Sequence, residues 1–124
     1  MRIGILTFHY ACNYGAMLQT YATQEFLRSM GHDVCVVDYR NKAVEEGYAA
    51  WNFKIDLLKT LPRAFSRAMR NSRFRHFMKE CLVLSKDPFD SFDVLLFGSD
   101  QIWNEIITGG FDKIYWGDFT TKAR

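Results

Sequence analysis

The first segment whose residue types could do chemistry is residues 9–16, with the sequence HYACNYGA. It follows an apolar run and precedes residues with helical spacing. At strand-to-helix turns of α/β sheets, backbone N–H groups and the positive end of the helix dipole favour an anion. The structural alternative is that Asn13 caps the helix and Gly15 permits close helix–sheet packing. The dinucleotide fingerprint GxGxxG is missing, and Asp38, placed for a ribose contact, does not restore it.

Histidine and cysteine in this turn do not complete a metal site. His9 and Cys12 are two residues apart, but zinc needs three or four ligands and no others lie nearby in sequence. We predict no metal and no cofactor. Cys12, Cys35 and Cys81 are odd in number and widely spaced, which predicts reduced thiols without a bridge.

A second polar segment is FGSDQIWN, residues 97–104, which follows another apolar run. Ser99 and Asp100 could hydrogen-bond a substrate, or they could cap a short helix beginning at Gln101. Trp103 could stack on a sugar ring or anchor the loop to the core. The residue types leave both interpretations open.

A cationic stretch runs from Arg63 to Lys79, with Arg63, Arg67 and Arg70 on one helical face. Such a stripe could meet nucleic acid, an acidic membrane surface or a polyanionic sugar. Apolar side chains on the other side favour an ordinary amphipathic helix with a solvated basic face. The net charge is only +2, and we expect no nucleic-acid partner.

The elements that position these segments form a strand–helix–strand unit. Residues 2–8 predict a central strand, residues 14–30 a helix that stops at Gly31, and residues 34–37 a second, parallel strand. Further along, we expect an exposed connection at 38–50, helices at 50–60 and 62–80, a third strand at 93–97 and an irregular or short helical tail at 111–124. The pattern predicts an α/β fold with a parallel sheet flanked by helices.

Length and composition bound this interpretation. The 124 residues suit one domain, and 48% hydrophobic with 16% aromatic residues excludes disorder. No apolar run reaches the roughly 20 residues of a membrane span, and no signal peptide is visible, so we expect a cytoplasmic location. A three-stranded sheet with an open edge suggests the opening part of a larger domain.

Two blocks carry a family resemblance. Residues 2–40, with Asn-Tyr-Gly-Ala at the helix start and Gly-His-Asp-Val after it, resemble the N-terminus of the polysaccharide pyruvyl transferase family. The segment FDVLLFGSDQIWN is similar to that family's second signature. The resemblance marks these positions for substrate binding: Asn13, Tyr14, Gly15, Gly98, Ser99, Asp100, Gln101, Trp103 and Asn104.

The resemblance implies a transferase that moves pyruvate from phosphoenolpyruvate to a sugar of a cell-surface or exopolysaccharide as a ketal. It also implies a Rossmann-like first lobe of a two-lobed, glycosyltransferase-like (GT-B-type) architecture. Residues 1–124 would then be the N-terminal portion, with catalytic residues beyond Arg124. The alternative is a non-catalytic α/β ligand-binding or interaction module, and the oligomeric state stays open.

Overall fold

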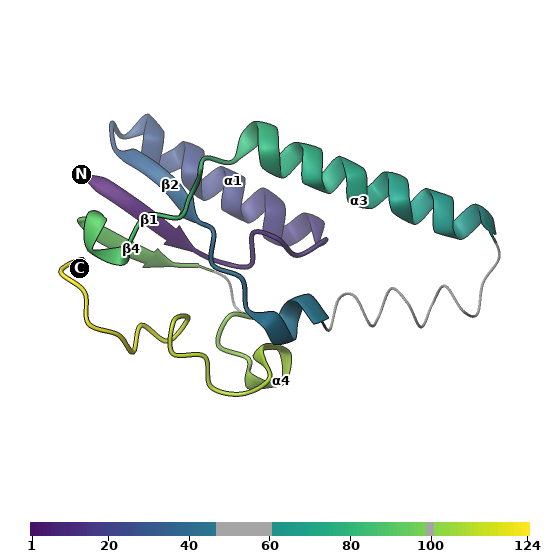
Figure 1. Cartoon of the computed structure of the whole chain (residues 1–124). Coiled ribbons are helices and arrows are strands. Elements are labelled where there is room, and N and C mark those ends of the chain that lie inside the picture. The colour runs from purple at the N-terminus through teal and green to yellow at the C-terminus, as the bar shows by residue number, and fades with distance from the viewer. Residues whose placement is uncertain (47–60, 99–100) are drawn as a thin grey trace.

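The computed structural model describes residues 1–46, 61–98 and 101–124 (Figure 1). In chain order the elements are β1 (Arg2–Leu6), α1 (Tyr14–Ser29), β2 (Asp33–Val37), α3 (Leu61–Cys81), β3 (Leu84–Ser85), the 3-10 helix η1 (Phe89–Ser91), β4 (Val94–Phe97) and α4 (Glu105–Thr108). The predicted α/β class and parallel sheet are confirmed.

The sheet has the strand order β3-β2-β1-β4, with every pair parallel. The predicted central position of the first strand is confirmed, because β1 pairs with β2 on one side and β4 on the other. The prediction of three strands was wrong. Strand β3 is only two residues long, too short to give a recognisable sequence pattern.

The βαβ unit forms for the reasons its sequence indicates. Strands β1 and β2 bury four of five residues each, as expected for parallel strands covered on both faces. The side chain of Asn13 caps α1, and Gly31 takes a φ of +85°, which favours glycine just past a helix end. Strand β1 ends at Leu6, two residues before the predicted end.

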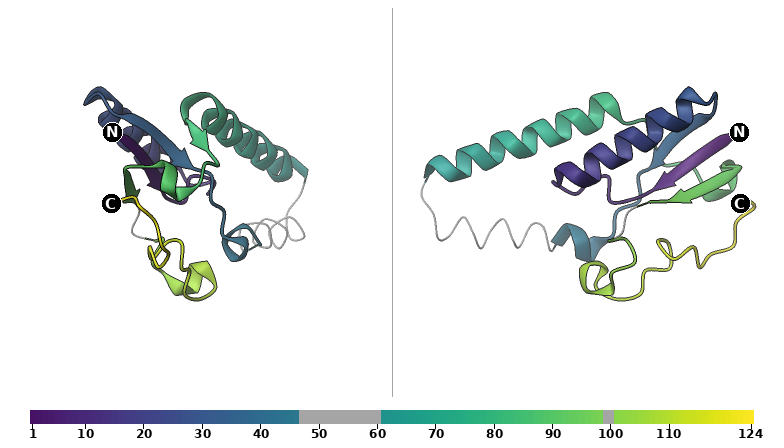
Figure 2. Two further views of the ribbon diagram at one scale, coloured as in Figure 1. Left: turned by 60° about the vertical axis from the view of Figure 1, so that its left-hand side comes forward. Right: turned by 180° about the vertical axis from the view of Figure 1, so that it is seen from behind.

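Helices α1 and α3 lie side by side over one face of the sheet, as both Figure 1 and Figure 2 show. Their buried side chains Met17 and Phe74 share a core with Ile3, Ile5 and the facing residues of β2. Helix α3 extends one residue beyond the predicted 62–80 at each end. Its amphipathic character is confirmed, because Phe77 and Met78 pack against this core.

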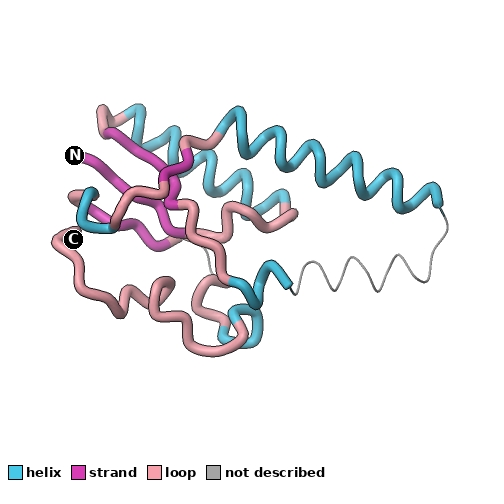
Figure 3. Tube along the Cα trace, in the orientation of Figure 1, coloured by secondary structure: helices cyan, strands magenta, loops and turns pink. Residues whose placement is uncertain are grey.

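The opposite face of the sheet carries no long helix among the described residues. Side chains that alternate with the first set, such as Leu6, Cys35 and Leu95, pack there against Ile114 and Phe119 of the C-terminal segment. Figure 3 shows this segment as an irregular loop, as predicted. The expectation of flanking helices therefore holds for one face only.

The predicted exposed connection at 38–50 needs correction. Residues 42–46 are helical and Val44 is buried, because its side chain joins the cluster formed by Phe8, Ile102 and Tyr115. The helix predicted at 50–60 lies outside the described residues. Within the described ranges, no helix combines the length and apolarity that crossing a membrane requires.

Candidate functional site

The two polar segments meet at the carboxyl ends of β1 and β4. The strand order reverses between these two neighbours, since the chain first moves from β1 to β3 and then returns to β4 on the other side. The backbone N–H of Gly98 donates to the carbonyl of Leu6 across 3.0 Å. Open α/β sheets bind ligands at such a reversal. We call this region, residues 7–16 with residues 98 and 101–104, the β1–β4 edge.

The first turn is held by its own backbone. His9 N–H donates to the Thr7 carbonyl at 2.9 Å, and Asn13 N–H to that of Ala11 at 2.7 Å. The Asn13 carboxamide oxygen accepts from Gly15 N–H at 2.8 Å and Ala16 N–H at 3.4 Å. The capping interpretation of Asn13 is thus confirmed, while a ligand role for it stays a prediction.

Tyr14 and Gly15 face outward at the start of α1. Tyr14 is 65% exposed, and its ring centre lies 4.6 Å from that of Phe74. A Cβ on Gly15 would approach the capping oxygen of Asn13 to 3.2 Å. The absence of a side chain at Gly15 therefore leaves space for the capping oxygen of Asn13 and keeps this part of the β1–β4 edge exposed.

The second turn has structural bonds of its own. Ser99 and Asp100 lie outside the described residues. The Gln101 carboxamide oxygen accepts from Asn104 Nδ2 at 3.1 Å, and the Trp103 indole N–H donates to the Tyr115 carbonyl at 2.9 Å. Trp103 is therefore anchored, yet its side chain stays 46% exposed.

The short helix that the capping alternative placed at Gln101 begins instead at Glu105. Its cap is Asn104, whose side-chain oxygen accepts from Ile106 N–H at 3.1 Å. Residues 101–103 form a turn, because Ile102 is drawn into the core and is fully buried with Phe8 and Tyr115.

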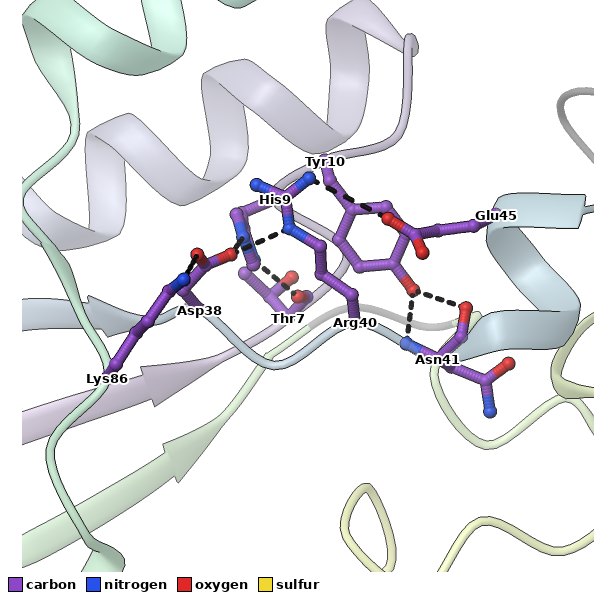
Figure 4. Close-up of polar contacts among 8 residues, drawn as sticks. All are labelled: Thr7, His9, Tyr10, Asp38, Arg40, Asn41, Glu45 and Lys86. Atoms are coloured by element: carbon purple, nitrogen blue, oxygen red, sulfur yellow. Dashed lines mark hydrogen bonds and ion pairs between the residues drawn. The ribbon is translucent and has the colours of Figure 1, made fainter.

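Sequence reasoning did not predict the hydrogen bond between His9 and Asp38 behind the first turn (Figure 4). His9 is 0% exposed. Its Nε2 lies 3.0 Å from Asp38 Oδ1, and its Nδ1 lies 3.3 Å from the Thr7 carbonyl oxygen. The pair joins the residues that follow β1 to those that follow β2.

Burial decides the protonation of this pair. It lowers the pKa of His9, because an imidazolium loses its hydration here, although the contact with Asp38 opposes the shift. For Asp38, burial favours the neutral acid, but hydrogen bonds from Arg40 and His9 outweigh it and hold the pKa below its ordinary value. These shifts favour a neutral His9 that carries its proton on Nε2 and donates it to a charged Asp38. This assignment agrees with the distances, because the contact to Asp38 is shorter than the contact of Nδ1 with the Thr7 carbonyl oxygen.

Two cations complete the charge around Asp38. Arg40 Nε lies 2.8 Å from Oδ1, and Lys86 Nζ lies 3.8 Å from Oδ2. Arg40 also reaches Glu45 at 3.6 Å, and its guanidinium lies 5.8 Å from the Tyr10 ring centre. The ends of β1, β2 and β3 are thereby linked through one carboxylate.

A second polar network lies beside the first. The Asp112 carboxylate accepts from Tyr39 Oη at 3.0 Å and from Asn41 Nδ2 at 2.5 Å. Nearby, Tyr115 is fully buried, and the side chain of Tyr10 lies close enough to its hydroxyl to affect its pKa. Burial raises the pKa of both Tyr39 and Tyr115, so both phenols stay neutral.

A sequence signal existed for the contact between His9 and Asp38 but not for the second network. His9 and Asp38 each come just after one of the two strands of the βαβ unit, and parallel neighbours end at the same edge. Asp112 pairs with residues more than 70 positions away, from an irregular segment without periodicity. Nothing in its local sequence indicates that contact.

The cysteines and acids near this edge do not form a metal centre. All three cysteines are free thiols, and burial raises the pKa of Cys35. In the ranges 1–46, 61–98 and 101–124, no three His, Cys, Asp or Glu side chains come together as metal ligands.

These features define a parallel α/β protein of the Rossmann type, with a polar edge where its strand order reverses. A family model described as polysaccharide pyruvyl transferase matches residues 13–123. The chain therefore belongs to the polysaccharide pyruvyl transferase family, whose name denotes transferases. Comparison with curated proteins and with solved structures gave no match.

Proposed function

We propose that this protein takes part in the transfer of pyruvate from phosphoenolpyruvate to a sugar of a cell-surface or exopolysaccharide. The observation that carries the proposal is the family match over residues 13–123. The adjacency of both signature blocks, through the bond between Gly98 and Leu6, supports a common binding edge. We further propose a cytoplasmic location, on the sequence expectation alone.

The reaction sets demands on the edge. One sugar hydroxyl adds to the enol carbon while a proton goes to the methylene carbon. A second hydroxyl then displaces phosphate, which leaves with that hydroxyl's proton, and a ketal remains. We propose that the edge positions the substrates through Asn13, Tyr14, Gly15, Gly98, Ser99, Asp100, Gln101, Trp103 and Asn104.

His9 has no exposed atom with which to protonate the methylene carbon. With 0% exposure and both ring nitrogens in contact with protein oxygens, it acts as a positioning residue for the turn. We therefore propose that residues 1–124 form an N-terminal portion of the transferase domain, the first lobe of a two-lobed architecture. Bond making would then depend on groups outside this portion.

The burial of His9 also favours a second candidate, a non-catalytic α/β ligand-binding module. Such a module would bind phosphoenolpyruvate or a saccharide saturably without chemistry. Phosphate release distinguishes the two candidates, because only the transferase produces free phosphate.

The test incubates the complete two-lobed protein, of which residues 1–124 would form the first lobe, with phosphoenolpyruvate, alone and with a panel of oligosaccharides, and measures free phosphate. A transferase is expected to release phosphate only when an acceptor is present. Phosphoenolpyruvate binding without release would favour the module, and the absence of both would refute the proposed function.

A charge-matched pair of variants locates the edge. Asn13→Asp keeps a good helix cap but adds a negative charge where an anion should bind. Gln19→Glu adds the same charge at an exposed position further along α1. We expect phosphoenolpyruvate binding to weaken at least about tenfold in N13D, corresponding to roughly 1.4 kcal/mol, and to stay near wild type in Q19E.

A further inference from the structure

The layer formed by α1 and α3 exposes more apolar surface than the outer face of a covering helix requires. Leu18 is 58% exposed and Phe26 is 66% exposed. Their spacing of eight residues, with Ala22 midway, puts them on one face of α1. Met30 and Met69 add exposed apolar groups. Side chains that are exposed singly are ordinary, but a row along one helix marks an interaction surface.

The same layer carries an excess of positive charge. The described side chains of α1 and α3 include the cations Arg28, Arg70, Arg73, Arg75 and Lys79, against only Glu25 and Glu80 as acids. The four cations of α3 whose side chains the structure describes are all exposed. A partner for this layer must therefore accept apolar side chains and also bring negative charge.

A groove between the two helices combines both properties. It has a volume of about 280 Å³ and is lined by Tyr14, Met17, Leu18, Arg73, Phe74 and Phe77. Aromatic contacts between α1 and α3 hold its walls, with Tyr21 and Phe77 ring centres 5.6 Å apart. One guanidinium thus stands at the border of an otherwise apolar groove.

Charge complementarity distinguishes between the possible partners. A second copy of the layer would bring like charges together. Nucleic acid would satisfy the cations, but its phosphates offer no contact to Leu18 and Phe26. An anionic bilayer satisfies both, since basic side chains meet its headgroups while apolar ones enter the boundary with the acyl chains.

We propose that the α1–α3 layer docks on the surface of an anionic lipid bilayer, with Leu18 and Phe26 inserted and Arg73 at a lipid phosphate beside the groove. This inference is independent of the proposed function, because Leu18, Phe26 and Arg73 carry it and none of them belongs to the β1–β4 edge; of the residues that line the groove, only Tyr14 is shared with that edge. It also assigns a binding role to the basic side chains of α3, which the sequence analysis had interpreted as a solvated face.

The test is co-sedimentation of the protein with vesicles of phosphatidylcholine alone and of phosphatidylcholine mixed with phosphatidylglycerol. We expect binding to the mixed vesicles only, and weaker binding as salt is raised. Arg73→Glu with Lys79→Glu should lower the partition coefficient at least about tenfold, because each basic group near such a surface contributes roughly a fivefold factor. Leu18→Ser with Phe26→Ser should lower it by a similar factor.

Matched controls lie away from the layer. Lys113→Glu changes an exposed cation of the C-terminal segment, and Ile106→Ser removes an apolar side chain that is 94% exposed on α4. Both should bind like wild type, and circular dichroism should show every variant folded. The proposal is overturned if the protein does not bind the mixed vesicles or binds neutral vesicles equally well. It is also overturned if the variants of the α1–α3 layer bind mixed vesicles like wild type, or if they abolish self-association or RNA binding instead.

Discussion

At the residue scale, the contact between His9 and Asp38 connects the turn after β1 to the segment after β2. Asp38 receives His9 at 3.0 Å and Arg40 at 2.8 Å, so its carboxylate stays charged although its side chain is only 10% exposed. Removing either partner of such a buried pair leaves polar atoms without compensation, which costs more than the pair contributes when intact.

His9→Gln keeps a hydrogen-bond donor but removes the titrating group. We expect its free energy of unfolding at about pH 7 to fall by about 1 kcal/mol or more, since glutamine does not place its donor where the imidazole Nε2–H meets Asp38 and leaves part of the buried ring volume empty. His76→Gln, at an exposed position of α3, should change it by less than about 0.5 kcal/mol. Urea unfolding followed by circular dichroism measures both.

The same variant tests the direction of the pKa shift. The folded-state pKa of His9 lies below its ordinary value of 6.5, so the unfolded chain binds the proton more readily. His9 therefore contributes stability that is complete above 6.5 and is lost as the pH falls below it, whereas the contribution of Asp38 is lost only below its ordinary 3.8. Wild-type stability should drop between about pH 7 and about pH 5, more steeply than that of H9Q. Equal slopes would show that His9 does not titrate in this way.

At the element scale, Gln24 joins α1 to the connection between α3 and β3. It is fully buried. Its carboxamide oxygen accepts from Val83 N–H at 2.8 Å, and its Nε2 donates to the Cys81 carbonyl at 3.0 Å. These bonds satisfy backbone groups of Cys81 and Val83, where the chain leaves α3, so that β3 can form beside β2.

Gln24→Met should preserve the side-chain volume and remove both bonds. We expect the free energy of unfolding to fall by about 1–3 kcal/mol, because buried backbone groups lose their partners. Gln19→Met, on the exposed face of the same helix, controls for helix propensity and should have little effect. If urea unfolding shows that both variants lose similar amounts of unfolding free energy, the two hydrogen bonds of Gln24 do not stabilise this connection.

At the scale of the whole molecule, the local sequence pattern predicted the βαβ unit, whereas contacts between distant residues decided the other features of the fold. The βαβ unit follows from apolar runs, the Asn13 cap and Gly31, all of which act within a few residues. The pairing of β1 with β4 brings the two family blocks together. Strand β3, the burial of Val44 and the Asp112 network depend on contacts between distant residues, which no local period encodes.

The candidate site divides in the same way. Asn13, Tyr14 and Gly98 could be placed at the edge because they follow strand ends. The roles of Trp103 and Asn104 could not be chosen beforehand, since their bonds to Tyr115 and Ile106 depend on how the second turn folds against the core.

The most direct test of the central claim, that the β1–β4 edge binds substrate, is a titration of the isotope-labelled protein with phosphoenolpyruvate, followed through the amide resonances by NMR. The expected result is saturable shifts concentrated at Gly15, Ala16 and Gly98, which weaken in N13D but not in Q19E. Saturable shifts centred elsewhere, or none at these amides, would contradict the assignment of this edge.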